Sequence, residues 1–178
     1  MIEAPDYHNM LALFVRLSRL SQLPSDAYLE NAFGVLEQVV ANPRFLERTP
    51  VERKPSSFAR SLVFGDNQLS VWAIAWAPGS STPIHDHHCS CCFAVLSGTL
   101  IERHFSAVDE EHAALAQEMV RPSGFITCFL PSGPNIHQMS NESDGEAVSL
   151  HIYGFDHRMH GSSIHREYRA VSALNRND

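Results

Sequence analysis

The first part of the chain carries apolar residues at a spacing of three to four positions. One apolar stripe runs through residues 11–20 and a second through residues 29–40. This period matches a helical turn, so the pattern predicts two amphipathic helices that each bury one face. Pro24-Ser25-Asp26 favours the start of the second helix, and Pro43 is expected to end it. The sequence thus predicts a helical N-terminal part over residues 1–45.

From residue 58 onward the pattern changes to short runs that favour β-strands, separated by turn-forming residues. Many short strands at regular spacing are typical of a sandwich or barrel. The expected strands are 58–64, 69–77, 83–87, 91–96, 99–106, 118–121, 125–130, 135–140, 147–153 and 164–172. The fold class is therefore expected to be mainly β. The sequence predicts one domain of 178 residues, in which α-helices precede an antiparallel double-sheet barrel of jelly-roll type over 58–172.

Charge and composition then narrow the classes of function. The formal net charge is −7 and the basic residues are scattered, which argues against nucleic acid or a membrane surface as a partner. No run is long and apolar enough to span a bilayer, and the N-terminus lacks the pattern of a signal peptide, so we expect a cytoplasmic protein. Three of the four cysteines lie within residues 89–92, whereas a disulfide framework spreads its cysteines along the chain. They also lack the paired CxxC spacing of zinc sites.

The strongest chemical signal is the segment Gly79-(five residues)-His85-Asp86-His87. Two histidines at positions i and i+2 of a strand point to the same face. If that face is the barrel interior, both imidazoles converge on one point, where they can bind iron, zinc, copper or nickel. The alternative is two partly exposed histidines at a strand end. Asp86 points the other way and is expected to be a structural hydrogen-bond acceptor.

Two segments resemble the motifs of the cupin superfamily. Residues 79–98 are similar to the first cupin motif, with Cys91 at the position of its glutamate. Residues 131–141 are similar to the second motif, with one more residue before the histidine. The resemblance implies a metal site of three histidines without a carboxylate: His85, His87 and His137.

Longer stretches resemble the cysteine dioxygenase family, over approximately residues 58–156. Residues 80–87 are similar to its ligand strand, and Cys91-Cys92-Phe93 to its cysteine–phenylalanine pair. Residues 147–153, with the sequence AVSLHIY, are similar to its AVSLHLY strand. Residues 60–63 are similar to the segment that carries its substrate-binding arginine.

This resemblance implies roles for individual residues around an Fe(II) cofactor. Ser149, His151 and Tyr153 would form a hydrogen-bonded chain that ends near the iron and the bound oxygen. Arg60 would hold the substrate carboxylate, because a guanidinium fork suits a bidentate carboxylate pair. The later arginines Arg158, Arg166 and Arg169 are alternative partners for the carboxylate.

Some members of the family carry a thioether bond between a cysteine and the tyrosine beside the iron. Tyr153 would be the tyrosine, and either Cys91 or Cys92 the cysteine. Counting back from Gly98 favours Cys91, because the turn fixes the strand register. Two ordinary buried thiols are the alternative.

The resemblance implies a thiol dioxygenase that adds both atoms of O2 to the sulfur of L-cysteine to give cysteine sulfinate. The loop after His87 is one residue shorter than in the animal-type enzyme and resembles that of 3-mercaptopropionate dioxygenases, which keeps that substrate as an alternative. A non-catalytic metal-binding cupin is an alternative of another class. The expected partners are a small thiol carboxylate and O2, and the family resemblance suggests a monomer.

Overall fold

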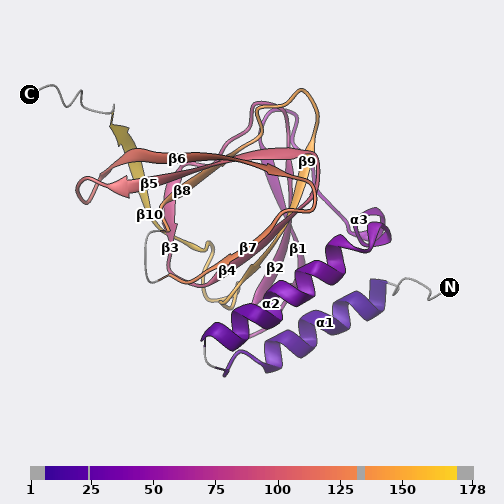
Figure 1. Ribbon diagram of the computed structural model, residues 1–178. Coiled ribbons are helices and arrows are strands. Elements are labelled where there is room, and N and C mark those ends of the chain that lie inside the picture. The colour runs from indigo at the N-terminus through magenta and orange to yellow at the C-terminus, as the bar shows by residue number, and fades with distance from the viewer. Residues whose placement is uncertain (1–6, 24, 132–134, 172–178) are drawn as a thin grey trace, which may run out of the picture.

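The computed structural model describes residues 7–23, 25–131 and 135–171 (Figure 1). Its helices are α1 (Tyr7–Arg19), α2 (Ser25–Val40) and α3 (Pro43–Arg48), so the two predicted helices are confirmed. The third helix was not predicted. Pro43 follows α2, as expected, but it also begins α3, because the fixed φ angle and missing N–H of proline suit the first helical position. None of these helices has the length and apolar character that crossing a membrane requires.

Ten strands follow in the described part of the chain, and most lie close to their predicted positions. The predicted strand 118–121 is too short, because β6 covers His112–Pro122 and pairs with β5 from end to end. Much of β6 is solvent-exposed, so its sequence lacks a clear alternation of apolar residues. Residue 172, the predicted end of the last strand, lies outside the described residues. The strands are β1 (Phe58–Gly65), β2 (Ser70–Trp76), β3 (Ile84–His87), β4 (Cys91–Ser97), β5 (Thr99–Ala107), β6 (His112–Pro122), β7 (Ile126–Phe129), β8 (His137–Ser140), β9 (Ala147–Tyr153) and β10 (Ile164–Val171).

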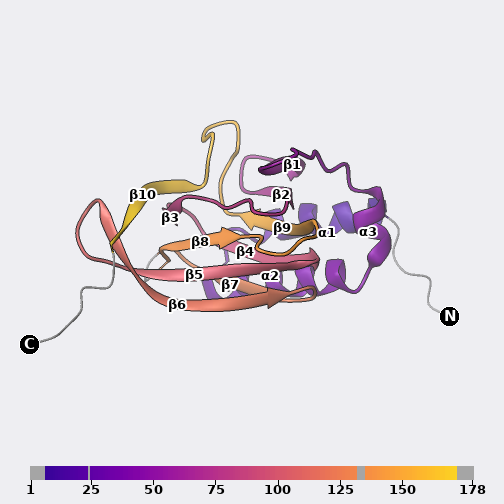
Figure 2. The same cartoon turned by 90° about the horizontal axis from the view of Figure 1, so that it is seen from above.

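The strands form two sheets on opposite sides of a barrel (Figures 1 and 2). The first sheet has the order β1-β2-β9-β4-β7, and the second has the order β10-β3-β8-β5-β6. The second sheet closes on itself, because residues 169–171 of β10 also pair in parallel with residues 112–114 of β6. This parallel contact departs from the wholly antiparallel barrel that we predicted. The double-sheet jelly roll itself is confirmed, and it is the architecture found in cupins.

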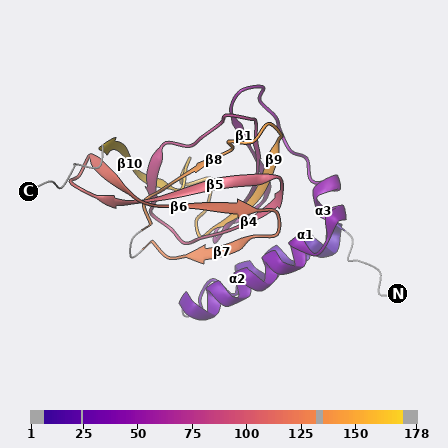
Figure 3. The ribbon, with the colours of Figure 1, turned by 45° about the horizontal axis from the view of Figure 1, so that its top comes forward.

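Helix α2 lies against the outer face of the first sheet at β4 and β7, and α1 packs beside α2 (Figure 3). Phe14 of α1 and Leu36 of α2 share an apolar cluster with Leu150 and Ile152 of β9. All seven residues of β9 are buried, since helices lie on one side and the barrel interior on the other. Because side chains alternate along a strand, the odd-numbered residues 149, 151 and 153 point into the barrel.

The turn between β4 and β5 requires a glycine. Gly98 has a φ of 72°, and a Cβ atom there would lie 2.8 Å from the Cα and Cβ atoms of Ala147. Gly79 has a similar φ of 76°, but a Cβ atom there would meet nothing within 4 Å. Both alanine variants should therefore have a free energy of unfolding that is lower by about 1 to 2 kcal/mol, because alanine is unfavourable at a positive φ. Only Gly98→Ala also overpacks, which should cost about 1 to 3 kcal/mol more. Denaturant unfolding of the two variants measures the difference, and equal losses would contradict the close approach at Gly98.

Candidate metal centre

The structure brings the three histidines that were predicted as ligands together inside the barrel. His85 and His87 lie on β3, and His137 begins β8, where it pairs directly with His85. One ring nitrogen from each lies within 4.8 Å of the others. The three residues are only 4 to 5% exposed. Strand β3 turns His85 and His87 to one face because they are two positions apart.

Hydrogen bonds orient two of these rings toward the centre. His85 Nδ1 lies 2.9 Å from the carbonyl oxygen of Pro83, and His137 Nδ1 lies 3.0 Å from Oε1 of Glu102. Both partners can only accept, so each Nδ1 carries the proton and each Nε2 is left as a free lone pair. His87 Nε2 lies 2.9 Å from His137 Nε2, which places a third nitrogen at the same point.

The ionisation of these histidines also suits metal binding. Burial, followed by the effect of His137, lowers the pKa of His85 to about 4 and that of His87 to about 2. Both rings are therefore neutral near pH 7, as a metal ligand must be. A set of three imidazoles with converging nitrogens fits a transition-metal ion such as iron, zinc, copper or nickel.

The group contains no carboxylate and no cysteine among the described residues. Cys91, at the position of the cupin glutamate, is not part of this group. Asp86, between the two histidines, points away and accepts hydrogen bonds from the backbone N–H of Arg166 at 2.8 Å and the hydroxyl of Tyr168 at 3.0 Å. Its predicted structural role is confirmed. Within the second motif, residues 132–134 lie outside the described residues.

A chain of hydrogen bonds runs along the inner face of β9. Ser149 Oγ lies 2.8 Å from His151 Nε2, and Tyr153 Oη lies 3.2 Å from His151 Nδ1. The ring of Tyr153 lies 5.7 Å from that of His87, measured between centroids, so the chain ends beside the histidines. The sequence did not indicate that Trp76 extends the chain, with its Nε1–H donating to Ser149 Oγ at 2.8 Å.

The direction of the protons follows from this order. Trp76 is only a donor, so Ser149 Oγ accepts from it, and the one acceptor contacting the Ser149 hydroxyl among the described residues is His151 Nε2. A neutral His151 then carries its proton on Nδ1 and donates it to the Tyr153 oxygen. Burial lowers the pKa of His151 to about 3, so the ring is neutral. The hydroxyl proton of Tyr153 is thereby left free to point at another acceptor.

The residues after β9 also contribute to this end of the chain. Ser163, which is 3% exposed and lies just before β10, is near enough to Tyr153 to act on the pKa of its hydroxyl. Burial, followed by the nearby Cys91, raises the pKa of Tyr153 well above its usual value, and the contact with Ser163 opposes this only in part. Tyr153 therefore keeps its proton at neutral pH.

The two adjacent cysteines lie on opposite faces of the first sheet. Cys91 pairs directly with Tyr153 across β4 and β9, and both belong to one buried cluster. Cys92 faces the helices and forms a disulfide with Cys128 of β7, which the clustering of cysteines did not suggest. The structure thus brings Cys91, and not Cys92, to Tyr153. The thioether bond itself stays a prediction.

Arg60 lies at the edge of the site rather than inside it. It is on β1, in register with Ile74, so it shares the face of the first sheet that carries the β9 chain. Its guanidinium is exposed and lies over the ring of Trp72, 5.6 Å from the centroid. No ion pair to Arg60 is found among the described residues.

The later arginines are already engaged in other contacts. Arg158 binds Asp156 at 2.7 Å, Arg166 donates to the backbone oxygen of Glu110, and Arg169 lies near Glu111. These three arginines thus have polar partners, whereas no ion pair to Arg60 is found among the described residues.

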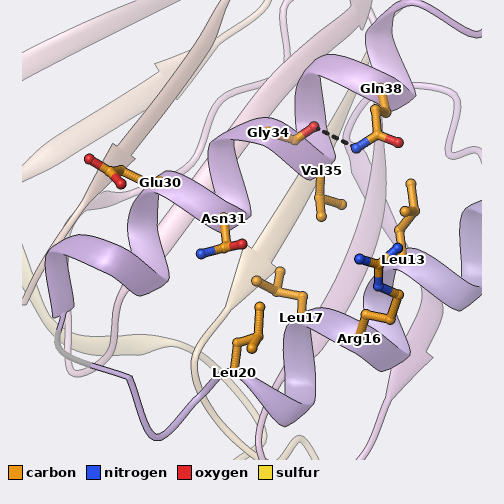
Figure 4. Close-up of a pocket in the computed structure, with 9 residues that line it drawn as sticks. All are labelled: Leu13, Arg16, Leu17, Leu20, Glu30, Asn31, Gly34, Val35 and Gln38. Atoms are coloured by element: carbon orange, nitrogen blue, oxygen red, sulfur yellow. Dashed lines mark hydrogen bonds between the residues drawn. The ribbon is translucent and has the colours of Figure 1, made fainter.

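A small pocket of about 90 Å³ adjoins the histidine site, and Glu102, Arg121, Phe129 and His137 are among its lining residues. A larger pocket of about 320 Å³ lies elsewhere, between α1 and α2 (Figure 4). Its lining residues all lie on these two helices or just after α1, and none of them belongs to the metal site.

Two curated plant proteins match parts of the chain. Auxin-binding protein T85 of Nicotiana tabacum is 44% identical over 96 residues, which are 53% of this chain and 50% of that protein. Auxin-binding protein 1 of Arabidopsis thaliana is 44% identical over 41 residues, which are 23% of this chain and 21% of that protein. The chain thus spans half or less of the length of the curated relatives it matches.

Solved structures with a similar fold are more distant in sequence. An uncharacterised conserved protein with a double-stranded beta-helix domain from Klebsiella pneumoniae is 18% identical, with a TM-score of 0.48 over 58% of this chain and 82% of that chain. A cupin superfamily protein from Desulfitobacterium hafniense is 13% identical, with a TM-score of 0.47 over 60% of this chain and 84% of that chain.

The sequence model of one family covers most of the chain. That family is described as cysteine dioxygenase type I, and the match extends over residues 51–172. This range includes every described strand and all three histidines of the site. The chain belongs to the cysteine dioxygenase type I family.

Proposed function

We propose that the protein is a non-haem Fe(II) dioxygenase that adds both atoms of O2 to the sulfur of L-cysteine and releases cysteine sulfinate. One observation carries this proposal: the hydrogen-bonded chain of Ser149, His151 and Tyr153 ends beside the three histidines in the same barrel. A storage or sensing site needs ligands but has no use for a polar chain next to them. The chain therefore favours catalysis over the alternative of a non-catalytic metal-binding cupin.

The proposed reaction is balanced without a further cofactor. A thiol, R–SH, and O2 combine to give a sulfinic acid, R–SO2H, so every atom and electron is accounted for. When bound, Fe(II) supplies the electronic chemistry that allows O2 to react with a thiolate. Under this proposal His85, His87 and His137 hold it through their converging ring nitrogens.

The remaining residues would orient the reactants and exclude water. The rings of Phe129 and Tyr153 lie 5.5 and 5.7 Å from that of His87 and shield the site from solvent. Tyr153 keeps its proton at neutral pH and is held by His151, so its hydroxyl can donate to an oxygen atom at the centre. Such a fixed donor is most effective in a site without bulk water, where hydrogen bonds are stronger.

Arg60 is proposed to hold the substrate carboxylate at the edge of the site. Its guanidinium is already placed over Trp72 and is not engaged by an acid among the described residues. A carboxylate bound here would leave the thiol end to reach inward. Both L-cysteine and 3-mercaptopropionate have these two groups, so 3-mercaptopropionate remains the second candidate substrate.

Oxygen uptake by the Fe(II)-loaded protein tests the proposal with L-cysteine, 3-mercaptopropionate and cysteamine, which lacks the carboxylate. We expect the highest kcat/KM with L-cysteine. Arg60→Met should lower kcat/KM for the two carboxylates roughly 10- to 100-fold, as loss of a charge-assisted hydrogen bond implies. The same variant should leave kcat/KM for cysteamine unchanged.

Arg158→Met is the matched control, since Arg158 binds Asp156 on the surface. A preference for 3-mercaptopropionate would replace the proposed substrate with the second candidate. If the iron-loaded protein consumed no oxygen with any of these thiols, the proposed reaction would be wrong.

A further inference from the structure

Glu102 is a charged side chain buried in the wall of the barrel, and no part of the proposed reaction requires it. It lies on β5 and is 1% exposed. Its Oε1 accepts hydrogen bonds from His137 Nδ1 at 3.0 Å and from His104 Nε2 at 3.1 Å. Its Oε2 accepts from the Nε and Nη2 atoms of Arg121 at 2.8 and 2.7 Å. Both carboxylate oxygens are thus fully engaged.

A carboxylate in such a place is costly unless every contact is made, because an unpaired buried charge is strongly unfavourable. Arg121 supplies such a partner, because two of its nitrogens lie 2.7 and 2.8 Å from Oε2 and pair the carboxylate with a positive charge. A leucine of similar size would fill this position without the free-energy cost of burying a charge. The carboxylate is therefore expected to have a role other than packing.

Arg121 fixes the carboxylate in one orientation. Its Nε and Nη2 atoms both donate to Oε2 of Glu102, and its guanidinium carbon lies 4.1 Å from the ring centroid of Phe125. The Arg121 side chain is only 16% exposed, so its position is restricted by packing. The other oxygen of Glu102 is consequently aimed at His137.

We propose that Glu102 is a positioning residue that sets the proton and the ring orientation of His137 for metal binding. Because the carboxylate can only accept, it holds the proton of His137 on Nδ1 and leaves the Nε2 lone pair directed at the centre. A carboxylate on the far nitrogen also makes a histidine a stronger metal ligand. His85 differs, since its Nδ1 donates to a neutral backbone oxygen. This inference rests on the metal site of the proposed function, but not on its reaction.

Two variants separate the charge of Glu102 from its hydrogen bond. Glu102→Gln keeps an acceptor but loses the charge, and Glu102→Leu loses both. Glu118→Gln is the matched control, because Glu118 lies on the neighbouring β6, binds Arg103 at 2.7 Å and is 51% exposed. Two readouts apply: the tautomer of His137 in the metal-free protein, from ¹⁵N NMR, and the dissociation constant for Fe(II), from competition with a chelator.

The wild type and Glu118→Gln should show the Nδ1–H tautomer and the same affinity. Glu102→Leu should populate the Nε2–H tautomer and bind Fe(II) about 10- to 100-fold more weakly, the usual effect of losing such a partner. Glu102→Gln should lie between them. An unchanged tautomer and affinity in Glu102→Leu would overturn the proposal. If that variant does not fold, an unchanged affinity in Glu102→Gln would overturn it, and a weaker affinity would support it.

Neither readout depends on turnover, so the two proposals fail separately. Fe(II) affinity that depends on Glu102, without oxidation of any thiol, would contradict the proposed reaction and leave the positioning role intact. Thiol oxidation together with an affinity that is independent of Glu102 would contradict only the positioning role.

Discussion

Replacing His85 with alanine should remove the metal and the activity together. His85 supplies one of three ligand nitrogens, and the site has no carboxylate to compensate for its loss. Losing a single outer partner of a ligand already weakens metal binding roughly 10- to 100-fold, so losing a ligand should cost more than about 100-fold. Metal content by atomic spectroscopy and thiol-dependent oxygen uptake measure both effects.

His88→Ala is a close control for this experiment. His88 lies three positions further along, but its ring points outward, with Nε2 2.9 Å from the backbone oxygen of Ser162 and the ring 5.0 Å from that of His160. The variant should keep its metal and most of its activity. A His85→Ala protein with wild-type metal content would show that His85 is not a ligand.

The metal-free protein should become much less stable as the pH falls from 7 to 4. The pKa of His151 is about 3 in the folded protein because the ring is buried, whereas an exposed histidine has a pKa near 6.5. Below about pH 6.5 His151 is therefore protonated in the unfolded chain but stays neutral in the folded protein. The free energy of unfolding then falls with pH until about pH 3, by about 1.4 kcal/mol for each pH unit at most. His151 alone should account for a loss of about 3 kcal/mol between pH 7 and pH 4.

Denaturant unfolding of metal-free wild type and His151→Gln at several pH values isolates this contribution. Glutamine can still form hydrogen bonds but does not titrate. Between pH 7 and pH 4 the free energy of unfolding of His151→Gln should therefore fall by about 3 kcal/mol less than that of the wild type. Ser149→Ala removes the neighbouring hydroxyl but keeps the titrating ring, and it should retain most of the wild-type slope. Identical slopes in wild type and His151→Gln would mean that the folded barrel accepts a proton on this ring.

Residues related by strand alternation could be predicted from the sequence. The spacing of two between Ser149, His151 and Tyr153 predicts a shared face, and it is found. Adjacent Cys91 and Cys92 must point to opposite faces, and counting back from Gly98 favoured Cys91 as the cysteine beside Tyr153. The register between β4 and β9 agrees with this choice, because Cys91 pairs directly with Tyr153.

Contacts between distant strands were harder to predict. Glu102 lies 35 positions before His137, and nothing local indicates that β5 and β8 are neighbours. The alternation of Leu100 and Glu102 on one strand does place the acid on the inner face, and this was the available signal. The exposure of Arg60 could not be predicted from the sequence either, because it follows from the position of β1 at the edge of the first sheet. The identity of the metal as iron, the monomeric state and the cytoplasmic location stay predictions.

The direct pairing of His85 with His137 joins positions 52 residues apart, measured along the chain. Such contacts have a high contact order and form late in folding, because a long loop must close before they can form. A metal ion that needs both residues then has high affinity only for the folded barrel. It should stabilise the native state by about 2.7 kcal/mol when its free concentration is a hundred times the dissociation constant. Metal supply would then control how much of the protein survives in a cell, as well as how much of it is active.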